Sequence, residues 1–339
     1  MNNSLQEMSV ADRLRRVGSP DQLYGVTRVT VDEGKARGAA LYQVKTGGGL
    51  CYDVTADNGL DIGCLSYRGV NISFLTKNGY VSPYGSHPFE EDFLHTFPGG
   101  MLYTCGLLST GPANRDTDGV WQPLHGRYHN IAADQCFGRV NDHAVIEVGG
   151  RIQETRLFGH SLEMRRTITS PVGGSELIIT DELTNNTPSP MEYMVLYHMN
   201  FGYPFLTQDL QMKLPEGTAT TPRTEEAAKG LGQERTFQEP VDGKEEQVYF
   251  HQVPADQGLG RVELYNPGLG FGAEVTWTKD TLPVLAQWKC MRSGEYVLGI
   301  EPTNSYIMGR SAERENGTIG MLQPFETRRM QVTLRFFDR

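Results

Sequence analysis

The sequence predicts an all-β protein built as one large domain. Its 339 residues include 39 glycines and 18 prolines, which favours many tight turns and short elements over a helical bundle. Apolar and polar residues alternate along much of the chain, and turn signals separate the alternating runs. With 38% hydrophobic and 21% charged residues, the composition is that of a globular protein rather than a disordered or fibrous one.

The domain is expected to span residues 25–339, after a polar N-terminal segment, 1–24. Within that segment, residues 5–17 are expected to form a short helix that Gly18 and Pro20 end. No solenoid repeat and no linker between two cores is apparent, and β-sandwiches often exceed about 200–250 residues as single domains. One domain is therefore favoured over two.

The strands follow from alternation with a period of two residues. The Asn58-Gly59 pair between two apolar runs is a strong hairpin signal. The expected strands cover residues 50–55, 60–68, 151–158, 161–169, 176–184, 191–201, 283–289, 295–301 and 327–337. One stretch, residues 215–247, is polar and nearly free of large apolar residues, so we expect a long surface excursion that covers part of any cleft.

Charge and cysteine content restrict the partners. The formal net charge is −10 and no dense basic stripe offsets it, which argues against nucleic acid and against an anionic membrane surface. The cysteines are scattered and form no C-x-x-C or zinc-finger spacing, which is typical of reduced thiols in a cytosolic protein; they are Cys51, Cys64, Cys105, Cys136 and Cys290. The N-terminal segment lacks the apolar core of a signal peptide. We expect a cytoplasmic enzyme or binding protein.

Common catalytic motifs are absent from the sequence. There is no phosphate-binding G-x-x-x-x-G-K-[ST] loop, and the glycines of residues 268–272 lack the spacing and βα setting of a dinucleotide loop. Neither a G-x-S-x-G elbow nor an H-E-x-x-H helix is present. The chemistry therefore has to come from other residues.

Two strands change from apolar to polar at their ends. His198 and Asn200 share one face of the strand 191–201, and Glu301 ends the strand 295–301 just before Pro302. A buried face that becomes polar at its end forms the edge of a cleft, where a histidine and a glutamate can serve as general acid and base. The alternative is that each is a hydrogen-bonded structural residue.

The densest polar cluster is residues 124–130, preceded by Trp121. His125 and Arg127 could donate hydrogen bonds to sugar hydroxyls while an aromatic ring stacks on the sugar. Alternatively, His125 and His129 could ligate a metal, although Gly126 and the strand-like surroundings do not suit a helical H-x-x-x-H site. We expect no metal and no cofactor.

Five motifs follow one another along the chain: Asn58-Gly-Leu-Asp-Ile-Gly63, Phe97-Pro-Gly-Gly-Met-Leu-Tyr-Thr-Cys-Gly106, Leu124-His-Gly-Arg127, Leu196-Tyr-His-Met-Asn-Phe-Gly-Tyr-Pro204 and Leu298-Gly-Ile-Glu-Pro-Thr-Asn304. In combination and order, they resemble the aldose 1-epimerase (galactose mutarotase-like) superfamily, and in particular a bacterial branch with poorly assigned substrates. The resemblance runs from about residue 25 to the C-terminus. It implies a single-domain β-supersandwich and a cofactor-free reaction at the anomeric carbon of a free sugar.

The resemblance also implies roles for individual residues. His198 corresponds to the family's acid, Glu301 to its base and His125 to a substrate-contacting histidine. Tyr197 stands where the family usually has asparagine. The other candidates for binding the sugar are Arg68 or Arg127 for the family's arginine, Asp61 or Gln287 for its aspartate, and Asn200 and Asn304.

The expected reaction is mutarotation. Glu301, as a carboxylate, would take the proton of the C1 hydroxyl while His198, as an imidazolium, protonates the ring oxygen. The expected partner is a small sugar, and a homodimer is compatible with the sequence. Two alternatives remain: a metal-assisted isomerase of a sugar or sugar acid that uses His125 and His129, and a non-catalytic carbohydrate-binding or regulatory relative.

Overall fold

The computed structural model describes the chain apart from residues 1–4, 6–7, 86–91 and 118. It consists almost entirely of antiparallel strands, which confirms the predicted all-β class. One sheet has five strands in chain order: β1 (Gly25–Thr30), β2 (Ala40–Lys45), β3 (Leu50–Thr55), β4 (Asp61–Tyr67) and β5 (Val70–Asn71). The predicted hairpin at Asn58-Gly59 joins β3 to β4.

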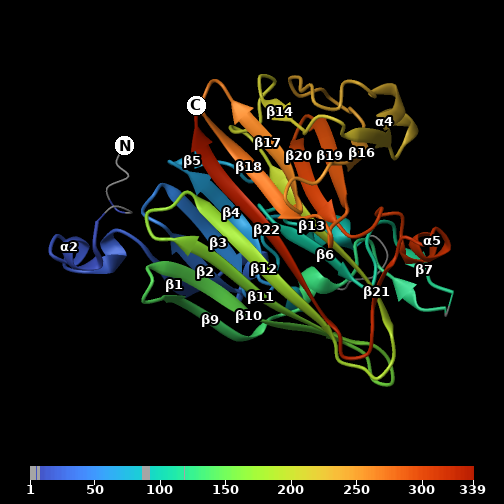
Figure 1. Cartoon of the computed structure of the whole chain (residues 1–339), viewed down its shortest axis with the longest axis horizontal. Coiled ribbons are helices and arrows are strands. Elements are labelled where there is room, and N and C mark those ends of the chain that lie inside the picture. Colours follow the sequence, from blue (N-terminus) through green and yellow to red (C-terminus); the bar gives the residue numbers. More distant parts are fainter. Residues whose placement is uncertain (1–4, 6–7, 86–91, 118) are drawn as a thin grey trace.

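The largest sheet has eight strands. Its order is β14 (Gln211–Lys213), β17 (Leu259–Asn266), β18 (Phe271–Thr278), β22 (Thr327–Asp338), β12 (Glu176–Asn185), β11 (Ser161–Pro171), β10 (Val145–Thr155) and β9 (Asp134–Val140). In Figure 1, β22, β12, β11 and β10 run side by side across the middle of the molecule. The predicted strands 151–158, 161–169 and 176–184 overlap β10, β11 and β12, which pair in chain order.

The third sheet has seven strands and carries the site described below. Its order is β15 (Ala219–Pro222), β16 (Gln247–Gln252), β19 (Val284–Arg292), β20 (Glu295–Thr303), β13 (Met191–Phe201) and β21 (Gly320–Leu322), with β6 (Tyr103–Leu107) also paired to β13. A short pair, β7 (Asn114–Arg115) and β8 (Trp121–Gln122), lies apart from it. The predicted strands 191–201, 283–289 and 295–301 are all present in this sheet.

The helices are short. They are α2 (Val10–Leu14), α3 (Phe93–Thr96), α4 (Glu225–Lys229) and α5 (Arg310–Glu315). Of the predicted helical span 5–17, α2 covers Val10–Leu14, while residues 6–7 lie outside the described residues. The polar stretch 215–247 contains β15 and α4, because Thr220 to Pro222 continue the sheet beside β16 and Thr224 caps α4 by accepting a hydrogen bond from the Ala227 amide.

Alternation along the strands accounts for the packing. In the eight-stranded sheet, Ile168, Ile179 and Val332 lie opposite one another on adjacent strands and are fully buried. In β13 both faces are buried: Tyr197 and its odd-numbered neighbours join the main core, whereas Leu196 joins a second apolar cluster. Strand β13 thus has the main core on one face and the second apolar cluster on the other.

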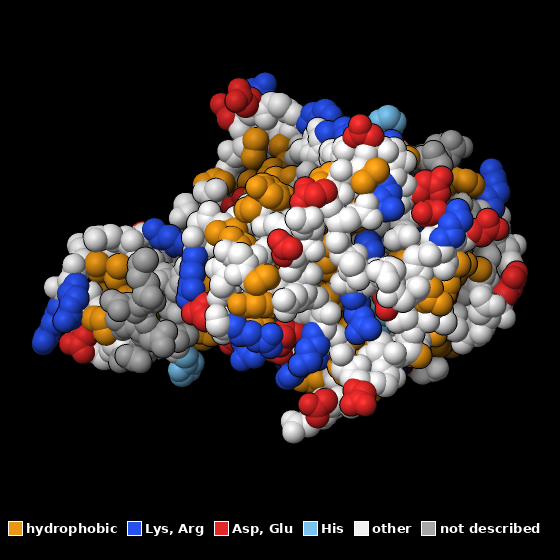
Figure 2. Space-filling view, turned by 90° about the horizontal axis from the view of Figure 1, so that it is seen from above, with side chains coloured by type: hydrophobic (Ala, Val, Ile, Leu, Met, Phe, Trp, Pro, Cys, Tyr) orange, Lys and Arg blue, Asp and Glu red, His pale blue; other side chains and the backbone are white. Residues whose placement is uncertain are grey.

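On the face shown in Figure 2, Lys and Arg side chains are interspersed with Asp and Glu side chains rather than gathered in one basic patch. Within the described residues, no helix has the length and apolar character needed to cross a bilayer.

Candidate active site

The register between β13 and β20 brings His198 and Glu301 together. Met199 lies opposite Ile300 and Leu196 opposite Thr303, so His198 stands directly across from Glu301 on the same face. His198 Nε2 is 3.3 Å from Glu301 Oε1, and the two side chains are only 7% and 2% exposed. The two residues singled out at strand ends in the sequence are therefore neighbours at one position of the sheet.

A glycine makes room for the carboxyl group. Gly299 lies two residues before Glu301 on the same face of β20, and a Cβ atom there would stand 2.3 Å from Glu301 Oε1 and 2.9 Å from Trp288 Cβ. Both distances are too short for real contacts, so any larger residue would displace the Glu301 side chain or the tryptophan. The local sequence is thus adapted to hold a carboxyl group at this depth.

The pair lies in a large cavity on the outer face of the third sheet. The cavity has a volume of about 1010 Å³, and His198, Glu301, His125, Trp288 and Phe97 are among its lining residues. Its volume is at the upper end of the roughly 300–1,000 Å³ range of ligand pockets. A monosaccharide and its substituents can be accommodated beside the pair.

Trp288 is the site residue that the sequence analysis missed. It lies on β19 opposite Gly299, its ring centroid is 5.4 Å from that of His198, and its Nε1–H donates to Glu246 Oε2 over 2.7 Å. This places an aromatic ring, fixed by a hydrogen bond, beside His198 and Glu301. Alternation across the hairpin β19–β20 puts residues 288 and 299 on one face, but the contact with His198 depends on the pairing of β13 with β20.

Burial favours the uncharged forms of both members of the pair. Burial raises the pKa of Glu301 to about 8, with a further upward contribution from Glu246. Burial lowers the pKa of His198 to about 4, against a smaller opposing effect of the Asn200 side chain. Between these pH values Glu301 holds a proton and His198 is neutral. The sequence analysis expected the same single proton on His198 instead, with Glu301 as a carboxylate.

The pair also has unused hydrogen-bonding capacity. Within the described part of the chain, His198 Nδ1 and Glu301 Oε1 are buried without a hydrogen bond of acceptable geometry. Buried polar atoms are normally bonded, and exceptions mark strained or functional positions. These atoms are candidates for interaction with a ligand.

His125 faces the same cavity from a neighbouring loop. Its ring centroid is 5.9 Å from that of His198, and its Nδ1 accepts a long hydrogen bond of 3.4 Å from the Gly111 amide. The proton of the neutral ring is then on Nε2, which can donate to a ligand. Burial lowers the pKa of His125 to about 3, and the nearby His198 contributes to this, so the ring stays neutral.

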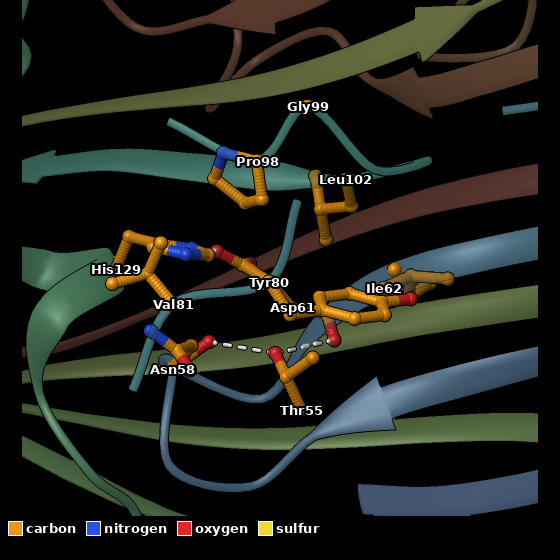
Figure 3. A pocket seen from close by; sticks show the side chains of 11 residues that line it. Thr55, Asn58, Asp61, Ile62, Tyr80, Val81, Pro98, Gly99, Leu102 and His129 are labelled. Atoms are coloured by element: carbon orange, nitrogen blue, oxygen red, sulfur yellow. Dashed lines mark hydrogen bonds and ion pairs between the residues drawn. The ribbon is translucent and has the colours of Figure 1, made fainter. Parts of the chain in front are cut away.

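Asp61 and His129 lie elsewhere, in a buried ionic cluster. Asp61 accepts hydrogen bonds from His129 Nδ1 at 2.6 Å, from the Thr104 amide at 2.8 Å and from Arg166 at 2.7 Å, and Arg166 also binds Asp181 through two nitrogens. Figure 3 shows Asp61 and His129 around a pocket of only about 10 Å³. Such a pocket has room for one water at most and for no sugar.

The two histidines of the H-x-x-x-H motif are therefore separated. His125 lines the large cavity, whereas His129 lies within the short 3-10 helix η4 (Tyr128–Asn130) and is held by Asp61. The chain turns sharply between them, with φ of +61° at His125 and +79° at Gly126. Across the described residues, no three His, Cys, Asp or Glu side chains are arranged to hold a metal ion.

The two candidate arginines do not line the large cavity. Arg127 borders a second cavity of about 460 Å³ and donates to the Trp121 carbonyl and to Gln122. Arg68 is at the surface, where its guanidinium binds Asp338 through two hydrogen bonds of 2.6 and 2.8 Å. Neither arginine is among the residues that line the cavity of His198 and Glu301.

The three amide candidates have structural contacts. Asn200 follows His198 on the same face and donates to the His198 and Gly100 carbonyls, which holds the end of β13. Gln287 is fully buried and binds His251 and the Glu234 carbonyl. Asn304 accepts from the Val195 amide, at 2.7 Å, and so ties β20 to β13.

The polar stretch 215–247 contributes to the large cavity, as expected. Its lining residues from this stretch come from 223–226, at the start of α4, and from 244–246, just before β16. Arg223 and Lys244 are the basic residues among them. The stretch therefore forms part of the cavity wall, next to β16.

Comparison with known proteins identifies a family and a fold. A family model described as a domain of unknown function, DUF4432, matches residues 36–336. No curated protein sequence matches the chain. Among solved structures, a Klebsiella pneumoniae protein whose name assigns it provisionally to the aldose 1-epimerases is similar with a TM-score of 0.88 and 24% identity, over 97% of this chain and 86% of that one.

More distant structures have the same architecture. A galactose mutarotase-like protein of Clostridium acetobutylicum matches with a TM-score of 0.64 and 14% identity, over 94% of this chain and 100% of that one. Galactose 1-epimerase of Lactobacillus acidophilus matches with a TM-score of 0.62 and 12% identity, over 93% and 99%. These likenesses confirm the galactose mutarotase-like fold that the motifs implied.

Proposed function

This chain belongs to the DUF4432 family, and we propose that it is an aldose 1-epimerase-like enzyme that interconverts the α and β anomers of a free sugar. The observation that carries the proposal is the His198–Glu301 pair, 3.3 Å apart on neighbouring strands and facing a cavity large enough for a sugar. The fold supports it, because one protein with this fold is named for galactose 1-epimerisation.

The reaction needs one proton on the pair. Glu301 holds it at the start, donates it to the ring oxygen and so assists cleavage of the C1–O5 bond, while His198 removes the proton of the C1 hydroxyl. The product is the open-chain aldehyde. Rotation about the C1–C2 bond presents the other face of the carbonyl. As the ring closes, His198 returns its proton to the carbonyl oxygen and Glu301 takes its proton back from the former ring oxygen.

This assignment exchanges the roles that the resemblance implied but keeps the chemistry. In both versions the pair carries one proton in total, and no proton is gained from or lost to the solvent during a cycle. Trp288 provides a flat apolar surface for the C–H side of the sugar, and His125 offers Nε2–H to a hydroxyl or to the developing carbonyl oxygen.

The test is anomeric exchange in two variants that retain shape. Glu301→Gln cannot donate or accept the reacting proton, and His198→Asn cannot act as a base, so each should lower the exchange rate by about 10²–10⁴-fold. The rate is measured by saturation-transfer NMR at the anomeric protons of common aldoses. Glu245→Gln, an exposed glutamate of the same cavity, is the matched control and should retain the rate.

Sugar binding and folding are measured in parallel. Affinity should change far less than rate, since the two groups act on the transition state. Glu301→Gln should unfold at the same or a higher temperature near pH 8, because ionising the buried carboxyl opposes folding as the pH rises from its unfolded pKa towards about 8. Near-normal exchange in either variant would reject that residue's role. Absence of exchange by the intact protein, with sugar binding retained, would favour a non-catalytic sugar-binding protein.

A further inference from the structure

The large cavity extends well beyond the catalytic pair. Towards the edge of the third sheet, its wall is formed by the polar stretch 215–247, whose contribution includes Arg223 and Lys244. If the anomeric carbon of a sugar lies at His198 and Glu301, the remaining substituents of the sugar extend into the rest of the cavity. The chemistry of this far wall therefore bears on the substrate.

The strand register fixes the position of Arg223. Its amide donates to the Val248 carbonyl, and Val248 lies opposite Trp288, which in turn lies opposite Gly299. Arg223 is thus three strands from β20, or about 14 Å between backbones at the usual strand spacing. Its guanidinium lowers the pKa of both Glu301 and His125, so its charge acts at the catalytic end of the cavity.

Arg223 and Lys244 differ from the two other cations of the cavity in having no partner among the described residues. Lys77 and Arg292 both form ion pairs with Glu295. By contrast, no hydrogen bond or ion pair engages the side chain of Arg223 or of Lys244 within the described residues, although both are half-buried. Half-buried cations normally have a partner, and a guanidinium presents a planar set of donors that matches a carboxylate or a phosphate.

The acidic residues nearby do not neutralise this site. Glu226 pairs with Lys229, and Glu246, which opposes Arg223 in its effect on Glu301, accepts the hydrogen bond of Trp288. Glu225 and Glu245 are exposed, where water and salt screen their charges. The unpaired guanidinium is therefore available to a ligand.

We propose that the sugar handled by this cavity carries an anionic group, a carboxylate or a phosphate, away from its anomeric carbon, and that Arg223 binds that group. This inference rests on the proposed function, because it takes the anomeric carbon to lie at His198 and Glu301. Lys244 lies on the same wall and adds positive charge, but it offers a single ammonium rather than a fork of donors.

The experiment compares three probes: glucose, glucuronate and glucose 6-phosphate. Anomeric exchange of at least one anionic probe should exceed that of glucose in kcat/KM by about tenfold or more, and the better anion distinguishes a carboxylate from a phosphate site. Arg223→Gln should reduce kcat/KM for that anion by about 10–100-fold, as expected for loss of a charge-assisted hydrogen bond. The same substitution should change kcat/KM for glucose by less than about twofold.

Matched variants isolate the role of the guanidinium. Arg292→Gln removes an arginine that is already paired with Glu295 and should leave the preference for the anion unchanged. Arg223→Lys keeps the charge without the planar fork and should restore part of the loss. Equal losses for glucose and the anion in Arg223→Gln, or no preference for either anion in the intact protein, would overturn the inference.

Binding separates failure of the inference from failure of the proposed function. Calorimetric titration of glucuronate and glucose 6-phosphate into the intact protein and into Arg223→Gln requires no turnover. Arg223-dependent binding without exchange of any aldose would reject the reaction and support the anion site. Exchange of all three probes without dependence on Arg223 would reject the anion site and support the reaction.

Discussion

Two histidine–carboxylate pairs lie within the described part of the chain, and they differ in how their polar atoms are satisfied. Asp61 has partners for both of its oxygens in His129, Thr104 and Arg166, and lies beside a pocket with room for one water. In the other pair, His198 and Glu301 keep unbonded polar atoms and face a large cavity. A saturated ionic cluster stabilises the fold, whereas an unsaturated pair is available for chemistry.

The largest effect should come from opening the saturated cluster. Arg166→Met leaves the carboxylates of Asp61 and Asp181 buried without their common partner, and we expect a loss of about 3–5 kcal/mol in the free energy of unfolding. Denaturant unfolding measures it. Arg139→Met, which breaks an ion pair with an exposed arginine, is the control and should cost less than about 1 kcal/mol.

An equally small loss in both arginine variants would show that the cluster does not contribute as its geometry indicates. If Arg166→Met does not fold at all, Asp181→Asn makes the same comparison. It keeps the volume of the side chain and removes one of the two charges that Arg166 binds.

A smaller effect is expected at the unsaturated pair when the adjacent ring is changed. Trp288→Leu removes the flat surface beside His198, so KM for the sugar should rise by about 5–30-fold, corresponding to about 1–2 kcal/mol, with a smaller change in kcat. Steady-state measurement of anomeric exchange gives both constants. Trp288→Phe keeps a ring, so its KM should lie between those of the intact protein and Trp288→Leu. A change confined to kcat would contradict a role in stacking.

The unsaturated pair should also respond to pH. Activity should be highest between about pH 4 and about pH 8: below this range His198 gains a proton and cannot accept another, and above it Glu301 loses the proton that it donates. The rate should fall about tenfold for each pH unit outside the range. A profile of kcat/KM, with folding checked at each pH, measures it. A rate that keeps rising above pH 8 would contradict the assignment of the proton to Glu301.

The sequence predicted the features that depend on local pattern. Alternation located β13 and the hairpin β19–β20, and the change from apolar to polar at two strand ends identified His198 and Glu301. Trp288 shares this hairpin, but its place beside His198 depends on the pairing of β13 with β20, which no local pattern fixes.

Other features depend on contacts distant in sequence. Asp61 has the polar character of a ligand-binding residue, yet Arg166, from another sheet, occupies its carboxylate. His125 and His129 have the spacing of a helical pair, but positive φ angles turn the chain between them. Arg223 lies in a stretch whose composition predicted a surface excursion, and its position at the far wall of the cavity follows from pairing that only the structure reveals.

The placement of His198 and Glu301 on adjacent strands bears on the energetics of the proposed reaction. The two side chains are held across a hydrogen-bonded ladder within a continuous sheet, so a sugar does not need to bring them together. Under the proposed function, little reorganisation should accompany each proton transfer. Changes in the segment between β15 and β16 would leave this ladder in place, but they would act on the pair through Glu246, which accepts the hydrogen bond of Trp288 and raises the pKa of Glu301.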